Sequence, residues 1–215
     1  MGSISVNKLG GFSVIIGPIV ALIGYFLQPG GMLIDAADPA NAQASMMAIT
    51  SNAGLSQVTG FVIAIGLVIF LYGLFVVQEN LKGDGNGDAL SRYGSLLLLV
   101  GILGWVTSTA LSNTIAGSDL QVAGEAAAAG TLYAATLGIG TTSGVMAALG
   151  FLALALAIYT RDDYNKIFAL VAAVVAVVTV VVTLIGGIDS TQLQTLAPVL
   201  GICFLIHTAW SISLG

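Results

Sequence analysis

Long stretches without a charged residue alternate with short polar segments along the whole chain. Six such stretches are at least 18 residues long: residues 10–27, 58–77, 93–115, 136–159, 167–188 and 196–214. A helix of about this length crosses the ~30 Å hydrocarbon core of a bilayer. A membrane strand would alternate apolar and polar positions, whereas the segment LVAAVVAVVTVVVTLIG is apolar on all sides. The pattern therefore predicts an all-α polytopic membrane bundle with six transmembrane helices.

The composition agrees with a chain that is surrounded by lipid. Hydrophobic residues make up 57% of the sequence and charged residues 7%, and the mean hydropathy is +1.04. Soluble domains carry about 25% charged residues, so membrane lipids are the expected surroundings of this surface. The net charge of −5 argues against binding to nucleic acid. Cys203 is the single cysteine, so no disulfide can form within the chain.

The charged residues predict an orientation in the membrane. If the amino terminus is inside, all basic residues fall in cytoplasmic segments: Lys8, Lys82, Arg92, Arg161 and Lys166. The three outer connections then carry only acidic charge: Asp35, Asp38, Asp119, Glu125 and Asp189. This is the positive-inside distribution. We therefore expect a prokaryotic plasma-membrane protein with both termini cytoplasmic and its acidic loops extracytoplasmic.

The sequence also suggests an internal repeat with an offset of about 84 residues. At this offset Lys8 aligns with Arg92, and Gly66 aligns with Gly150. Each copy would contain two crossings, so the copies run parallel, unlike the inverted repeats of many transporters. The single membrane domain, residues 1–215, would then consist of repeats 1–84 and 85–168 followed by a third hairpin, 169–215.

Small residues recur every seven positions within the predicted spans. The glycines in these stripes are Gly10, Gly17, Gly24, Gly66, Gly73, Gly94, Gly101 and Gly150. A seven-residue period keeps a stripe on one helix face, and small residues let membrane helices approach closely. We interpret the stripes as helix-packing seams; a glycine-lined pore is the alternative. The outer segments 39–54 and 123–138 are predicted to form short extracytoplasmic helices or helical extensions, with bends near Gly54 and near residues 138–140.

Candidate chemistry is sparse. Asp, Glu, Lys and Arg are missing from the middle of the predicted spans, which argues against proton pumping and voltage sensing. His207 is the lone histidine, and Cys203 lies on the same helix face. A metal or cofactor site there would need further ligands, so we expect a packed histidine and predict no catalytic residue, metal or cofactor. The hinge KGDGNGDALSR carries Asp84 and Asp88 but lacks the glycine and glutamate of a calcium loop; we interpret it as a flexible turn.

Polar side chains gather in the outer halves of the third and fourth spans. They could line a vestibule for a neutral solute, or simply bond to helix carbonyls. The candidates are Ser108, Ser112, Asn113, Thr141 and Thr142. Trp105, Trp210 and Tyr25 are interpreted as anchors at the membrane interface.

The stretch NKLGGFSVIIGPIVALIGYFL, together with the alternation of helices and charged hinges, resembles a broad group of uncharacterised bacterial and archaeal six-helix membrane proteins. That resemblance implies a shape and no site residues. Our leading hypothesis from sequence is a non-catalytic structural or accessory protein, which associates with itself or with other membrane chains. A passive channel or facilitator for a small neutral or cationic solute is the alternative, and a membrane enzyme acting on a lipid is the third.

Overall fold

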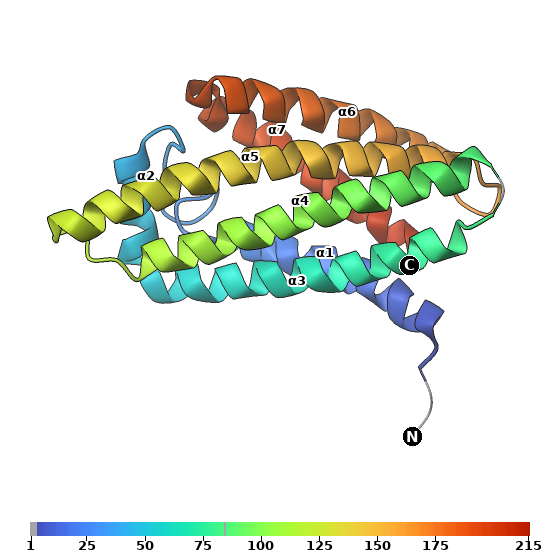
Figure 1. Cartoon of the computed structure of the whole chain (residues 1–215), viewed down its shortest axis with the longest axis horizontal. Helices are drawn as coiled ribbons and strands as arrows, with labels where there is room; N and C mark the ends of the chain where they lie inside the picture. Colours follow the sequence, from blue (N-terminus) through green and yellow to red (C-terminus); the bar gives the residue numbers. More distant parts are fainter. Residues whose placement is uncertain (1–3, 84) are drawn as a thin grey trace.

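The computed structural model describes residues 4–83 and 85–215, and within them the regular secondary structure is helical, with no strands (Figure 1). Six long apolar helices span enough length to cross a membrane, and a short α2 and a 3₁₀ helix, η1, lie between them. The elements are α1 (Val6–Leu27), α2 (Ala42–Ser51), α3 (Ala53–Asn80), α4 (Asn86–Ala116), α5 (Ala123–Tyr159), α6 (Lys166–Ile188), η1 (Ser190–Gln192) and α7 (Leu193–Leu214). The predicted all-α membrane bundle is confirmed.

Several helices begin where a polar side chain can cap them. Ser5 accepts a hydrogen bond from the Lys8 backbone N–H at the start of α1. Asn165 does the same at α6, where its side-chain oxygen accepts from the backbone N–H groups of Ile167 and Phe168. These caps satisfy donors that the first helical turn leaves unpaired. Polar residues at the membrane boundaries therefore mark where these two apolar helices begin.

The six long helices form a closed ring in chain order. Each packs on the next, from α1 through α3, α4, α5 and α6 to α7, and α7 packs back on α1. Successive long helices run antiparallel, and the two termini lie at the same end of the bundle (Figure 1). The faces turned away from the ring carry exposed apolar side chains such as Phe61, Val174 and Leu184. Such an exterior matches contact with lipid.

Glycines mark the closest approaches within two helix pairs. A Cβ at Gly17 of α1 would lie 2.4 Å from the backbone N of Phe70 in α3. A Cβ at Gly94 of α4 would lie 2.9 Å from the backbone N of Leu154 in α5. Gly66 faces Gly17, and Gly150 faces Gly94, in the same way. Helix backbones can touch at such points because no side chain separates them.

These contacts relate the two helix pairs by two different offsets. Positions 17 and 24 of α1 occupy the places that positions 94 and 101 occupy in α4, an offset of 77. Positions 66 and 70 of α3 correspond to 150 and 154 of α5, an offset of 84. The contact positions of α4 and α5 are therefore seven residues farther apart in the sequence than those of α1 and α3. An offset of 84 residues aligns the contact positions of α3 with those of α5. The same offset misaligns α1 with α4 by seven residues, which is about two helical turns.

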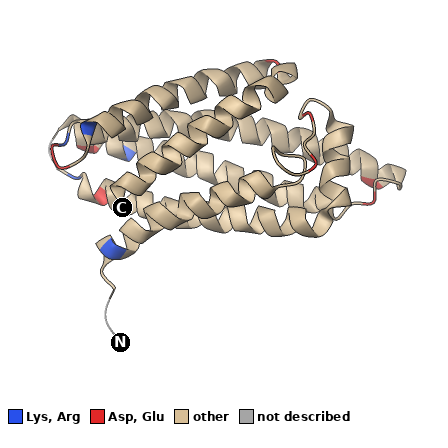
Figure 2. Ribbon diagram, turned by 180° about the vertical axis from the view of Figure 1, so that it is seen from behind, with Lys and Arg blue, Asp and Glu red and all other residues tan. Residues whose placement is uncertain are grey.

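The two ends of the bundle differ in charge (Figure 2). We call the end that holds all the Lys and Arg residues the cationic end; there Lys82, Arg92, Arg161 and Lys166 pair with Glu79, Asp88, Asp163 and Asp162, respectively. The hydrogen bond from Lys166 lowers the pKa of the Asp162 carboxyl. The opposite end, here the acidic end, carries Asp35, Asp38, Asp119, Glu125 and Asp189. The net negative charge of the chain is thus concentrated at the acidic end.

The segments at the acidic end agree with the sequence expectations in one case and differ in the other. α2 is a short separate helix, as expected, and the helical path is interrupted at Asn52, close to the expected bend at Gly54. α5 runs without interruption through residues 138–140, where a bend was expected. In the hinge at the cationic end, Asp84 lies outside the described residues, and Asp88 receives two hydrogen bonds from Arg92. Asp88 is therefore engaged in an ion pair of α4.

Candidate functional site

The ring of helices surrounds a pocket with a volume of about 420 Å³. All six long helices contribute to its wall, and the loop between α1 and α2 contributes at the acidic end. Representative lining residues, one from each helix in order, are Ala21, Leu67, Trp105, Gly140, Thr183 and Phe204. A concave, mostly apolar cavity with a few polar groups is the usual form of a small-molecule site. Among the described residues that line it, none is Asp, Glu, Lys or Arg.

Three aromatic rings cross the interior of the pocket. Trp105 of α4 meets Phe204 of α7 edge to face, with ring centroids 5.7 Å apart. Phe204 meets Tyr25 of α1 in the same manner, at 6.0 Å. Edge-to-face contacts are favourable because the positive ring edge meets the negative ring face. This aromatic layer joins helices that are not adjacent in chain order and gives the pocket an apolar surface.

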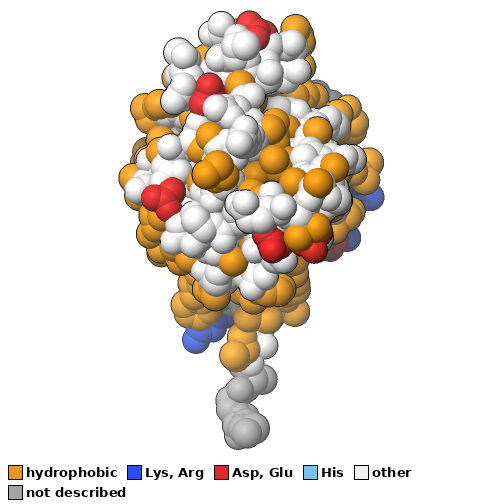
Figure 3. All heavy atoms as spheres, turned by 90° about the vertical axis from the view of Figure 1, so that its left-hand side faces the viewer, with side chains coloured by type: hydrophobic (Ala, Val, Ile, Leu, Met, Phe, Trp, Pro, Cys, Tyr) orange, Lys and Arg blue, Asp and Glu red, His pale blue; other side chains and the backbone are white. Residues whose placement is uncertain are grey.

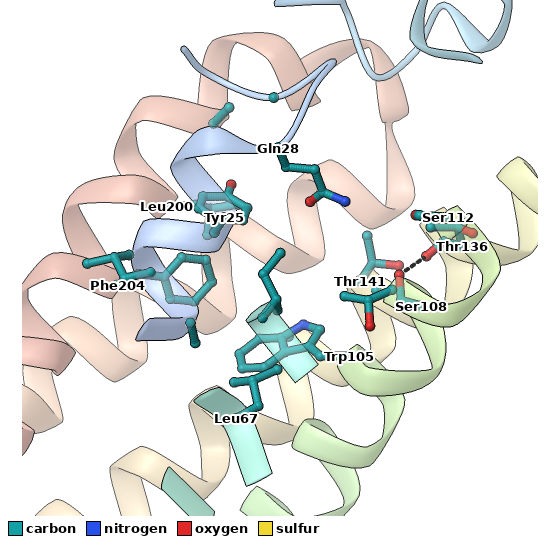
Figure 4. Close-up of a pocket in the computed structure, with 18 of the residues that line it drawn as sticks. Tyr25, Gln28, Leu67, Trp105, Ser108, Ser112, Thr136, Thr141, Leu200 and Phe204 are labelled. Atoms are coloured by element: carbon teal, nitrogen blue, oxygen red, sulfur yellow. Dashed lines mark hydrogen bonds between the residues drawn. The ribbon is translucent and has the colours of Figure 1, made fainter. Parts of the chain in front are cut away.

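Hydroxyl groups lie across from part of this layer (Figure 4). In that view Tyr25, Leu200 and Phe204 are on one side, and the other side holds Ser108, Ser112, Thr136 and Thr141. Ser108 donates to the Thr136 carbonyl at 3.3 Å, and Thr141 donates to the Leu137 carbonyl at 2.9 Å. A hydroxyl that donates to its helix still has lone pairs that accept. This side of the pocket therefore offers acceptors to a bound molecule.

The deepest part of the pocket is a second aromatic cluster. Phe151 of α5 stacks on the His207 ring with centroids 4.5 Å apart and planes 13° from parallel. Phe151 also contacts Phe70 of α3 at 6.1 Å and Trp210 of α7 at 6.3 Å. Phe70, Phe151 and His207 all line the pocket, and fully buried side chains such as Leu74 and Leu154 follow toward the cationic end. The cluster forms the floor of the pocket.

His207 is buried, with 3% of its surface exposed. Neither ring nitrogen has a hydrogen-bond partner among the described residues. Buried polar atoms in proteins nearly always have a partner, so an unpaired imidazole in a pocket wall is unusual. Cys203, one turn earlier, is buried but is not part of the lining. In the described chain, no group of three His, Cys, Asp or Glu residues could hold a metal ion.

The loop from Gln28 to Asn41 covers part of the pocket at the acidic end. Its residues Pro29, Gly30 and Pro39 belong to the lining. Gly30 has φ +80°, which a glycine adopts without strain. The Tyr133 hydroxyl of α5 donates to the Pro39 carbonyl at 2.9 Å and ties the loop across the ring. The loop therefore forms a roof, and we use that name for residues 28–41 below.

Seen from the acidic end, the molecule presents an apolar centre with charges around it (Figure 3). Hydrophobic side chains gather near the middle of this face, and Asp and Glu side chains lie toward its edge. The acids attract cations to this end, but the wall of the pocket itself is uncharged. The charged rim and the neutral interior are thus separate features.

The structure brings together only some of the residues that the sequence proposed for a vestibule. Ser108, Ser112 and Thr141 line the pocket. The Asn113 side chain instead packs against Gly60 of α3, and Thr142 is exposed on α5. Neither is part of the lining.

Aromatic residues in the pocket were missed by sequence reasoning. Tyr25 and Trp105 line the pocket, and Trp210 is buried behind its floor with 3% exposure. The interpretation of Trp210 as an anchor at the membrane surface is therefore wrong. The position of an aromatic residue along a span does not tell which way its side chain points. Both the lipid and the interior of the helix bundle are apolar surroundings that accept an aromatic side chain. The available signal was the clustering of Phe204, His207 and Trp210 at helical spacing on α7.

The sequence matches no protein-family model, and neither a curated protein nor a solved structure is similar to the chain.

Proposed function

We propose that this integral membrane protein binds a small, neutral, mainly apolar molecule inside its ring of helices and admits it from the acidic end. The observation that supports this proposal best is the pocket of about 420 Å³, walled by all six long helices and uncharged throughout its described lining. Binding there corresponds to the facilitator hypothesis, restricted to neutral solutes. We propose no catalytic step and no cofactor.

The uncharged wall favours a neutral occupant. A full charge moved into this interior would lose its hydration without gaining a counter-ion. Such a transfer costs on the order of several kcal/mol in proteins. Aromatic and aliphatic side chains such as Trp105, Phe204 and Leu67 supply the apolar contact. The hydroxyl oxygens of Ser108 and Thr141 supply acceptors, since their own protons go to helix carbonyls. A compact molecule with an apolar body and a donor group fits this wall.

The same geometry weakens the main reason for proposing a structural or accessory role. That hypothesis was motivated by glycine packing seams in a chain without titratable chemistry in its spans. In the fold, Gly17 faces Gly66, and Gly94 faces Gly150, so these faces are occupied within the chain. Self-association or a partner chain would therefore have to use the aliphatic exterior.

The proposal is tested by filling the pocket from one side. Gly140 lines the pocket, and a Cβ there meets only the Ser108 hydroxyl oxygen at 3.7 Å, an ordinary contact. Gly140→Phe should therefore project a ring into the cavity. Naphthalene binding to the protein in lipid nanodiscs would be followed by quenching of tryptophan fluorescence, because Trp105 is in the wall. We expect saturable binding that weakens at least ~tenfold in Gly140→Phe.

Gly138→Phe is the matched control, because Gly138 is on the same helix, has no neighbour within 4 Å of its Cβ position and is not in the lining. It should bind naphthalene like the unchanged protein. Absence of saturable binding, or equal loss in both variants, would contradict the proposal. Uptake of the same probe into proteoliposomes would then separate a facilitator, which accelerates equilibration, from a protein that only binds.

A further inference from the structure

We infer that His207 is the recognition group of the pocket and hydrogen-bonds a hydroxyl or N–H group of the bound molecule. The inference rests on the proposed function, and it names the ligand class: a neutral molecule with an apolar ring system and one hydrogen-bonding group that reaches the floor. The site is built from the stacked ring of Phe151, the imidazole of His207 and the aromatic layer above them.

The position of His207 makes it the polar end of an otherwise apolar floor. Its ring lies flat against Phe151, 4.5 Å between centroids, so the stacking fixes the plane in which its nitrogens lie. Trp210 contacts the ring edge-on at 6.4 Å. Phe151 covers one face of the ring, and the two nitrogens are its only polar atoms, so a molecule in the cavity that hydrogen-bonds to the ring must do so at one of them. A neutral imidazole offers one N–H donor and one acceptor.

The surrounding polar groups do not satisfy this ring. Ser211, one turn after His207 on α7, donates to the His207 backbone carbonyl at 2.8 Å and so directs its proton away from the imidazole. Both ring nitrogens have no partner within the described residues. A buried polar group without a partner costs ~1–3 kcal/mol. A ligand hydroxyl that bonds to the ring would recover part of that cost, which makes binding selective for molecules that carry such a group.

The first experiment uses the fact that the chain has one histidine. Protein labelled with ¹⁵N only in histidine gives imidazole nitrogen signals from His207 alone. The probes are 2-naphthol and naphthalene, which differ by one hydroxyl. We expect 2-naphthol to shift a ring-nitrogen signal and naphthalene to leave both signals nearly in place. Equal shifts, or none with 2-naphthol at saturating concentration, would overturn the inference.

The second experiment compares affinities for the same two probes. His207→Phe keeps a ring to stack on Phe151 and removes both nitrogens. The ratio of the 2-naphthol to the naphthalene affinity should fall about tenfold in this variant, the effect of one hydrogen bond. Using the ratio cancels the different partition of the probes into lipid. Ser95→Ala is the control, since Ser95 is also buried and unpaired but lies outside the lining, and it should leave the ratio unchanged.

The outcomes separate the two proposals. If both probes bind and Gly140→Phe weakens both, but His207→Phe leaves the ratio unchanged, the pocket binds ligands and the role of His207 is wrong. If neither probe binds, the proposed function and the inference both fail. If His207→Phe does not fold, the nitrogen signals of the unchanged protein decide the question by themselves.

Discussion

At the scale of single residues, the close contacts between helices depend on glycine, which has no Cβ atom. The Cβ position of Gly17 lies 2.4 Å from a backbone atom of α3 and 2.8 Å from the Gly66 carbonyl oxygen. Backbone atoms cannot move aside as a flexible side chain can, so any larger residue must push the two helices apart. Other glycines, such as Gly130 of α5, have no neighbour within 4 Å. Glycines in this chain are therefore not equivalent.

A pair of alanine substitutions tests this difference. Gly17→Ala should lower the free energy of unfolding by ~1–3 kcal/mol, the usual cost of overpacking. Gly130→Ala should leave it unchanged or raise it by ~0.5–1 kcal/mol, because alanine favours the helix. Reversible unfolding in mixed detergent micelles, followed by circular dichroism, measures both. A Gly17→Ala protein as stable as the unchanged chain would refute the backbone contact.

At the scale of elements, side-chain hydrogen bonds join the roof over the pocket to the helices. The hydrogen bond from Tyr133 to Pro39 joins residues 94 positions apart and links the roof to α5. Asp35, in the roof, has a positive φ of 44° and is bonded by the Asn52 side chain. A non-glycine residue in this region is strained, so such local bonds help to keep the roof in place. We therefore expect that the roof can loosen while the helices stay folded.

Removing one of these bonds should loosen the roof selectively. Tyr133→Phe keeps the ring and removes the hydroxyl, which costs ~1 kcal/mol of local stability. Amide hydrogen exchange in residues 28–41 should become ~fivefold faster, while exchange in α4 and α6 stays the same. Tyr159→Phe, at an exposed position near the cationic end, is the control and should change nothing in the roof. Unchanged exchange in Tyr133→Phe would show that this bond does not hold the roof.

At the scale of the whole molecule, charge separates the two ends of the ring. All Lys and Arg residues lie at one end, and among the described residues the other end carries only acidic charge (Figure 2). By the positive-inside rule we propose that the cationic end faces the cytoplasm. The pocket would then receive its molecule from outside the cell or from the outer leaflet.

Site-directed labelling tests the proposed orientation. In a chain with Cys203→Ala, single cysteines are introduced as Asn86→Cys at the cationic end and Gln121→Cys at the acidic end. A membrane-impermeant maleimide should label Gln121→Cys on intact cells and should label Asn86→Cys only after the cells are opened. The reverse result would invert the topology. Equal labelling of both positions on intact cells would mean that the chain inserts in two orientations.

The amino-acid sequence by itself determined that the chain has six apolar helices long enough to span a membrane and, within a few residues, where these helices end. It did not determine where they all begin, because α5 begins at Ala123, well before the apolar run that starts at residue 136. Long uncharged runs have one stable form in lipid, and polar caps such as Ser5 and Asn165 start two of them. The sequence also pointed to Ser108, Ser112 and Thr141 as neighbours, because their positions on adjacent spans place them at one depth.

Only the tertiary structure decided which face of each helix is interior. In a soluble protein water and core differ in polarity, but here lipid and core are both apolar, so hydropathy does not tell which side of a segment like α6 is inside. Its buried face is marked only by small residues such as Ala172 and Ala176. The ring closure between α1 and α7, the inward aromatic rings of Trp105 and Phe204, and the unpaired imidazole of His207 all depend on that choice. Packing geometry made it, and in the pairs α1–α3 and α4–α5 it did so through backbone contacts at a few glycines.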